Sequence, residues 1–321
     1  MTPSPDVAPR DSIARRDDAA SSGRTYMDIA FKDIMQLEAH GPDTYVGTGP
    51  RYPWDGLYGG QVVAQALCAA KLTVKAGYLP HSLHANFLRM GDASEPVRYE
   101  VERLRDGASF FARQVVARQS TGAILNMSAT FRLLAPPTMD VQVAVAPDTA
   151  GPGEGQQVSW SRLFDMRAVA PPTKVPGDSD NRTGTGNDGR GGGGRGRGRE
   201  RDRDREQTAC SWFRLLEDLG DDPTGHAAAL AFISDSGPAR LVSELHETSC
   251  KPDVPWRPLS LDHAIWYHRP FRSDEWLLLQ TFGASLYNSS GLATGRVFSQ
   301  DGALVASIAQ EVLLRQPRGD T

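Results

Sequence analysis

A glutamine near the C-terminus lies in an otherwise apolar strand pattern. The alternate positions of segment 304–314 are Leu304, Ala306, Ile308, Gln310, Val312 and Leu314. Because successive side chains of a strand point to opposite faces, Gln310 shares its face with these apolar residues. A carboxamide without partners there costs about 1–3 kcal/mol, so it must be hydrogen-bonded. Gln310 is therefore either a structural tie between a loop and the sheet or part of a polar site.

The carboxylate of Asp235 is a second candidate, at the end of a helix predicted over residues 226–235. It lies on the same helical stripe as Ala228, Ala231 and Phe232. The last turn of a helix disfavours negative charge, and an apolar surrounding disfavours it further. Both effects raise the pKa of Asp235 unless hydrogen-bond donors compensate. The alternative is an exposed aspartate that ends a helix before a Gly-Pro pair.

A hydroxyl and another carboxylate follow in the strand predicted over residues 259–268. Ser260, Asp262, Ala264, Trp266 and His268 occupy alternate positions and share one side of this strand. A serine at the start of a strand is structural in most proteins. Asp262 is the rival of Asp235 for the role of a catalytic carboxylate.

Two similar sets of elements must position these residues. In the first half, a helix begins at Gly59, and strands are predicted over 81–88, 97–104, 109–119 and 124–133. In the second half, the helix 226–235 precedes strands predicted over 259–268, 276–286, 292–299 and 303–315. Arg89 matches Arg269, and Gly122 matches Gly302, at an offset of about 180 residues. One apolar helix per antiparallel meander predicts an α+β double hotdog, with each long sheet wrapped around a central helix.

The bulk composition excludes several classes of protein. The chain has 321 residues and a formal charge of −4, which gives no general attraction to nucleic acid or membranes. No apolar run approaches the roughly 20 residues that span a bilayer. Three widely spaced cysteines, Cys68, Cys210 and Cys250, argue against a disulfide scaffold or a zinc site and fit a reducing compartment. The C-terminus is not a peroxisomal tripeptide, so a cytoplasmic location is expected, with a peroxisomal or mitochondrial location as the open alternatives.

Two segments are too polar to pack. Residues 1–26 are predicted to be a disordered tail, without the apolar core of a secretory signal. Residues 173–206 contain a run of Gly and Arg followed by alternating charges, which predicts a disordered insert between two strands. Its charges neutralise each other and no aromatic residue is interleaved, which favours a solvated loop over RNA binding. The predicted domains are an N-terminal hotdog over 27–150 and a C-terminal hotdog over 151–316, with a tail over 317–321.

The ordered segments resemble the acyl-CoA thioesterase II family of double-hotdog enzymes. The resemblance rests on these stretches: residues 57–67 (LYGGQVVAQAL), 81–92 (HSLHANFLRMGD), 105–110 (RDGASF), 233–235 (ISD), 260–263 (SLDH), 269–271 (RPF), 300–302 (QDG) and 310–311 (QE). They keep the family's order from about residue 27 to 315. The resemblance implies an enzyme that hydrolyses fatty acyl-CoA, needs no cofactor or metal, and assembles into a homodimer or a larger oligomer.

The resemblance also implies roles for particular residues. An aspartate, a serine or threonine, and a glutamine hold the hydrolytic water, and these carry over to Asp235, Ser260 and Gln310. Backbone N–H groups of Gly59, Gly60 and Gln61 are candidate donors to the developing oxyanion at the N-terminus of the first helix. Arg89 is a candidate partner for the coenzyme A phosphates, as are Arg103, Arg105 and Arg113.

Two other functions remain open. One is a hotdog enoyl-CoA hydratase, although no hydratase-type motif with a Pro-Leu-His or Pro-Phe-His end is present. The other is a non-catalytic acyl-CoA-binding protein that uses the same pocket. A pure binding protein gains nothing from a buried carboxylate, which favours the enzyme.

Overall fold

The computed structural model describes residues 29–54, 56–134, 138–171, 208–250, 253 and 256–316. The predicted tails at 1–26 and 317–321 and the predicted insert at 173–206 lie outside the described residues. The boundaries predicted for the two hotdog domains stay a prediction.

The secondary structure follows the two predicted sets of elements. The first comprises α1 (Phe31–Met35), β1 (Glu38–Ala39), β2 (Thr44–Gly47), α2 (Gly59–Leu72), β3 (Tyr78–Phe87), β4 (Val97–Asp106), β5 (Phe110–Gln119) and β6 (Gly122–Leu133). The second comprises a short 3-10 helix (Pro152–Glu154), β7 (Gln156–Gln157), β8 (Phe164–Val169), β9 (Thr208–Leu215), α4 (Pro223–Ser234), α5 (Ser236–Cys250), β10 (Arg257–Ser260), β11 (Asp262–Tyr267), β12 (Leu277–Tyr287), β13 (Ser290–Ser299) and β14 (Leu304–Arg315).

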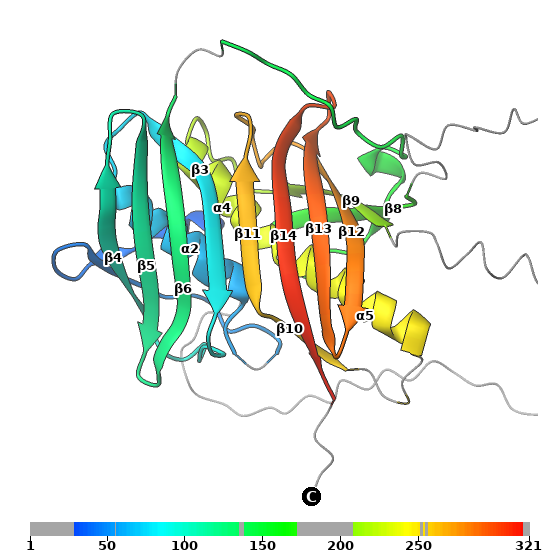
Figure 1. Cartoon of the computed structure of the whole chain (residues 1–321), viewed down its shortest axis with the longest axis horizontal. Helices are drawn as coiled ribbons and strands as arrows, with labels where there is room; N and C mark the ends of the chain where they lie inside the picture. Colours follow the sequence, from blue (N-terminus) through cyan, green and yellow to red (C-terminus); the bar gives the residue numbers. More distant parts are fainter. Residues whose placement is uncertain are drawn as a thin grey trace, which may run out of the picture.

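The strands form one antiparallel sheet that runs through both halves of the chain. Its order is β1-β2-β4-β5-β6-β3-β11-β14-β13-β12-β9-β8-β7, and β10 pairs with β14 beside this path. The halves join edge to edge, because β3 pairs with β11 with His84 opposite Ala264. Figure 1 shows the broad central part of the sheet in front, with β8 and β9 behind it. A strand edge from each half is thereby covered by the other half.

The long helices α2 and α4 lie against the inner face of the sheet and against each other (Figure 1). Alanine and other strong helix formers dominate both sequences, and Pro223 occupies the first turn of α4, where its missing N–H is tolerated. Their apolar side chains belong to one core with the strands; Val63, Leu67 and Phe232 are fully buried in it. This arrangement confirms the predicted α+β double hotdog.

A second helix in the C-terminal half differs from the prediction of one helix per half. The Gly-Pro pair after Asp235 does not end the helical segment; α5 begins at Ser236 and includes Pro238 in its first turn. Proline is tolerated there because no intrahelical partner is needed for its nitrogen. Helix α5 packs against β12, β13 and β14 and buries Leu241 and Val242.

The strand predicted over 259–268 is broken at Leu261 into β10 and β11. Alternation therefore does not run unchanged through the segment. Ser260 pairs opposite Val312, and beyond the break His263, Ile265 and Tyr267 are the buried positions. The prediction that Ser260 and Asp262 present the same face to one site is wrong for this reason.

The strands that flank the insert are paired as predicted. Strands β8 and β9 are antiparallel, with Phe164 opposite Leu215. The segment between them thus connects two neighbouring strands within the C-terminal half. No helix formed by the described residues is both long and apolar enough to cross a membrane.

Candidate active site

The three polar residues predicted to share a site are in direct contact. The Ser260 hydroxyl donates to Asp235 Oδ1 at 3.0 Å. Gln310 Nε2 lies 2.9 Å from Asp235 Oδ1 and 2.7 Å from Ser260 Oγ. The same amide nitrogen lies 3.1 Å from the Asp235 backbone carbonyl. Residues up to 75 positions apart in sequence thus form one hydrogen-bonded triangle.

Each member of the triangle is placed by a different element. Asp235 caps α4 with helical dihedral angles and is followed at once by α5. Ser260 is the last residue of β10, and Gln310 lies within β14, the strand that pairs with β10. The carboxamide is fully buried, as the apolar alternation of β14 predicts. The hydrogen bonds of its Nε2 supply partners for the amide nitrogen, whereas its Oε1 has none among the described residues.

Asp262, the rival carboxylate, has a structural role. Its Oδ1 accepts a hydrogen bond from the Glu311 N–H at 2.7 Å, and the Leu261 N–H donates to the Glu311 carbonyl at 2.8 Å. These bonds replace part of the strand ladder where β10 and β11 separate. The Asp262 side chain therefore stabilises the irregular backbone between β10 and β11.

Burial controls the electrostatics of Asp235. The residue is 5% exposed, and desolvation raises the pKa of its carboxyl above the ordinary value. Four neighbours oppose this rise in pKa: the His263 ring, the Ser260 hydroxyl, the Gln310 amide and the Gly60 N–H. The expected competition between burial and compensating donors is present, and burial prevails.

The N-terminus of α2 reaches this carboxylate because two glycines begin the helix. A Cβ on Gly59 would lie 2.9 Å from Asp235 Oδ2, and one on Gly60 would lie 2.1 Å from the Phe232 carbonyl oxygen. Side chains at these positions would push α2 away from α4. The predicted oxyanion donors Gly59 and Gly60 therefore stand next to the triangle.

Gln61 lies in the core and not at the triangle. Its side chain is fully buried and accepts a hydrogen bond from the Tyr52 hydroxyl at 2.7 Å. Its backbone N–H donates to the Tyr58 carbonyl at 3.1 Å. Because this N–H is bonded within the helix start, it is not available to the oxyanion.

Three of the four predicted phosphate-binding arginines have structural partners, and Arg105 stays a prediction. Arg89 donates to the Ala123 carbonyl at 2.7 Å, and its counterpart Arg269 donates to the Leu304 carbonyl at 2.8 Å. This shared contact explains the arginine in both halves without a substrate. Arg103 forms a bidentate pair with an aspartate, Asp43. Arg113 is fully buried and cannot meet a phosphate in solvent.

The site contains a histidine that the sequence analysis did not assign. His263 is fully buried, and its Nε2 lies 2.9 Å from the Ser234 hydroxyl. Burial lowers the pKa of His263, and the neighbouring Asp235 carboxylate opposes this shift. Unbroken alternation from Ser260 places His263 on the strand face opposite Ser260. The break at Leu261 shifts the alternation, so that His263 lies on the buried face.

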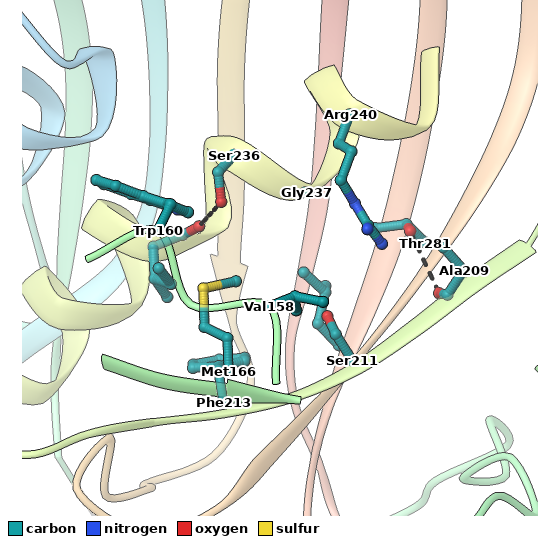
Figure 2. A pocket seen from close by; sticks show the side chains of 12 residues that line it. Val158, Trp160, Met166, Ala209, Ser211, Phe213, Ser236, Gly237, Arg240 and Thr281 are labelled. Atoms are coloured by element: carbon teal, nitrogen blue, oxygen red, sulfur yellow. Dashed lines mark hydrogen bonds between the residues drawn. The ribbon is translucent and has the colours of Figure 1, made fainter. Parts of the chain in front are cut away.

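A cavity of about 230 Å³ lies at the junction of α4 and α5 (Figure 2), and the three triangle residues are not part of its lining. Ile233 and Ser236, which flank Asp235 in sequence, both line it. Its apolar wall comprises Val158, Trp160, Met166, Phe213 and Leu279. Ser211, Arg240 and Thr281 line it as well, and Arg240 reaches toward Thr281 in Figure 2. The cavity is thus a mainly apolar space lined by residues next to Asp235 in sequence.

The described residues contain no cluster of three His, Cys, Asp or Glu side chains arranged as metal ligands. The triangle and its surroundings offer a carboxylate, a hydroxyl, a carboxamide and the backbone N–H groups of α2. Such a set can orient a water molecule and accept its proton.

Comparisons with known proteins identify the family of this chain. Residues 50–132 match the family model of the acyl-CoA thioesterase N-terminal domain, and residues 140–314 match that of the acyl-CoA thioesterase C-terminal domain. Acyl-coenzyme A thioesterase 8 of Rattus norvegicus is 30% identical over 99% of this chain and 98% of its own length. Acyl-CoA thioesterase 2 of Haemophilus influenzae is 30% identical over 88% of this chain and 96% of its own.

A solved structure shows the same fold at similar identity. The acyl-CoA thioesterase II TesB2 from Mycobacterium marinum is 32% identical, with a TM-score of 0.72 over 91% of this chain and all of its own. The similarity extends through both halves and includes the segments that form the triangle. The chain therefore belongs to the acyl-CoA thioesterase II family, as its sequence predicts, and is an acyl-CoA thioester hydrolase.

Proposed function

We propose that this chain hydrolyses fatty acyl-CoA to a free fatty acid and coenzyme A by direct attack of water. The observation that carries the proposal is the hydrogen-bonded triangle of Asp235, Ser260 and Gln310 beside the glycines of α2. A buried carboxylate with a raised pKa is suited to accept a proton near neutral pH. A hydroxyl and an amide on the same carboxylate restrict where the water can lie.

In this mechanism, Asp235 accepts a proton from the water. The oxygen of that water attacks the carbonyl carbon of the thioester. The carbonyl oxygen becomes an oxyanion near the N-terminus of α2, where the backbone N–H of Gly59 and the helix dipole stabilise negative charge, while the Gly60 N–H stays bonded to Asp235. The carbon–sulfur bond then breaks. A thiol has an ordinary pKa of about 8.5, so coenzyme A leaves as a thiolate with little acid assistance. The proton held by Asp235 passes to solvent or to the departing sulfur.

The cavity at the junction of α4 and α5 is the proposed site of the acyl chain. Its apolar wall suits hydrocarbon, and Ile233 and Ser236 connect it to the position of Asp235. A chain inside it leaves the thioester beside the triangle. Arg240, whose side chain is 48% exposed, then lies at the boundary between this cavity and solvent.

The first prediction concerns the base. Asp235→Asn lowers thiol release from saturated C2–C18 acyl-CoAs about 10²–10⁴-fold, because the amide cannot accept the proton. Binding of a non-hydrolysable thioether analogue, measured by calorimetry, is retained. Asp262→Asn is the matched control and keeps turnover, since an amide oxygen still accepts from the Glu311 N–H. If Asp262→Asn loses turnover and Asp235→Asn keeps it, Asp262 is the base. If the wild type binds the analogue but releases no thiol, the chain is a non-catalytic acyl-CoA-binding protein.

The second prediction concerns pH. The base acts when deprotonated, and the pKa of Asp235 is raised by burial, so kcat/KM falls on acidification at a pH above the ordinary aspartate pKa. Ser260 donates to the charged form and lowers this pKa. Ser260→Ala therefore moves the acid limb to higher pH, whereas Ser299→Ala at the end of β13, whose hydroxyl bonds to the Ala303 carbonyl, leaves it in place. An unmoved limb in Ser260→Ala contradicts the assignment of Asp235 as the titrating base.

The third prediction concerns chain length. Ala209→Met reduces the cavity and lowers kcat/KM for long acyl-CoAs more than for short ones. The difference is about fourfold for each methylene that no longer fits, which corresponds to about 0.8 kcal/mol of lost burial. Ala303→Met, in the turn before β14, serves as the control and preserves the profile. If Ala209→Met lowers kcat/KM equally for all chain lengths, the acyl chain does not bind in this cavity.

The fourth prediction concerns assembly. The family resemblance supports a homodimer or a larger oligomer as the functional form. Light scattering on the full chain is expected to give at least twice the mass of one chain, and a monomeric mass contradicts the proposal. The cytoplasmic location remains a prediction from the sequence.

A further inference from the structure

His263 and Gln310 each leave one polar atom without a partner in the core. Both side chains are fully buried, and the atoms concerned are His263 Nδ1 and Gln310 Oε1. A buried polar atom without a hydrogen bond costs about 1–3 kcal/mol. One of these atoms can carry a proton and the other only accepts one, so pairing them satisfies both.

The orientation of the Gln310 carboxamide is chemically significant. Its Nε2 faces Asp235 Oδ1 and Ser260 Oγ, which places Oε1 on the other side of the group. Rotation by 180° exchanges the two ends with almost no change in shape. The rotated form would direct a carbonyl oxygen at a carboxylate and remove a donor from the site. Something must therefore hold the amide in the productive orientation.

The imidazole ring of His263 is the group that can hold the Gln310 amide in this orientation. Its Nε2 lies 2.9 Å from the Ser234 hydroxyl, which can donate to it. The proton of a neutral ring is then on Nδ1. Burial lowers the pKa of His263, while Asp235 and then the Gln310 side chain favour its protonated form. Ala264 pairs opposite Ala309, so His263 and Gln310 are the next cross-strand positions of β11 and β14, and both are fully buried. The unpartnered Gln310 Oε1 is therefore the acceptor available to this ring N–H.

We propose that His263 is a positioning residue that donates from Nδ1–H to Gln310 Oε1, while its Nε2 accepts from the Ser234 hydroxyl. The inference deepens the proposed function and rests on it, because the orientation matters only if Gln310 helps to hold the water. His263 itself transfers no proton in the reaction. Its effect is on the geometry of the Gln310 amide, and through that amide on Asp235 and Ser260.

Three substitutions of His263 distinguish this role from a merely structural one. Asparagine keeps a donor near the position of Nδ1, glutamine keeps a polar group near the position of Nε2, and leucine keeps neither. His263→Asn is expected to retain kcat within a few-fold. His263→Gln and His263→Leu are expected to lose about 100-fold in kcat with KM changed less than twofold, since a small misplacement of a reacting group has an effect of this size.

A purely structural role anchored at Ser234 predicts the opposite order, with glutamine tolerated and asparagine not. That order overturns the proposal. Ser234→Ala is expected to change kcat only a few-fold, because the Nδ1 contact remains. Thermal melting and binding of the thioether analogue are measured for every variant, so that a loss of folding is separated from a loss of turnover.

A second measurement does not depend on turnover. Nitrogen NMR of the full chain labelled at histidine reports the tautomer of each neutral ring, and the spectrum of His263→Asn assigns the signal among the seven histidines. The Nδ1–H tautomer is expected for His263, and the Nε2–H tautomer overturns the proposal whatever the activity. Absence of thiol release by the wild type, by contrast, refutes the proposed function and leaves the tautomer result interpretable.

Discussion

The close approach of α2 to α4 is the constraint on which the site depends. Gly60 brings the backbone of α2 against the Phe232 carbonyl, and the Tyr58 hydroxyl donates to the same carbonyl at 2.6 Å. This contact places the positive end of one helix dipole beside the carboxylate at the end of the other. The cost of burying Asp235 is therefore shared among an N–H group, a hydroxyl and an amide. A larger residue at Gly59 or Gly60 would separate α2 from α4 and remove the N-terminus of α2 from Asp235.

The edge-to-edge sheet explains why both halves are needed for one site. The glycines come from the first half, whereas Asp235, Ser260 and Gln310 come from the second. Pairing of β3 with β11 fixes the halves and therefore the distance between those groups. Thr130 corresponds to Gln310 at the internal offset of 180 residues, and its hydroxyl lies 2.8 Å from Ser82. The repeated fold thus carries the carboxamide in the C-terminal half, while a hydroxyl pair occupies the matching strands of the first.

Local pattern predicted much of this structure. Helices α2 and α4 and the long strands follow from apolar periodicity, and the offset between Gly122 and Gly302 predicts two similar halves. The burial of Gln310 follows from strand alternation alone. The continuation from α4 into α5 was missed because a Gly-Pro pair is typical of a helix end, yet here it lies in the first turn of a new helix. The break at Leu261 was missed because the bonds that hold it connect β11 to β14, which are distant in sequence.

The fold class and the family can be predicted from the chain alone, because periodicity and short motifs are local properties, and the family resemblance implies Asp235, Ser260 and Gln310 as one site. Packing between distant elements is needed to see which carboxylate contacts Ser260 and Gln310, that His263 is buried across from β14, and that a cavity lies at the junction of α4 and α5. The tertiary structure also shows that Gln61, Arg89 and Arg113 have partners in the protein. Contacts between strands and helices far apart in sequence control these features, and a desolvated polar group takes whichever partner the packing brings within reach.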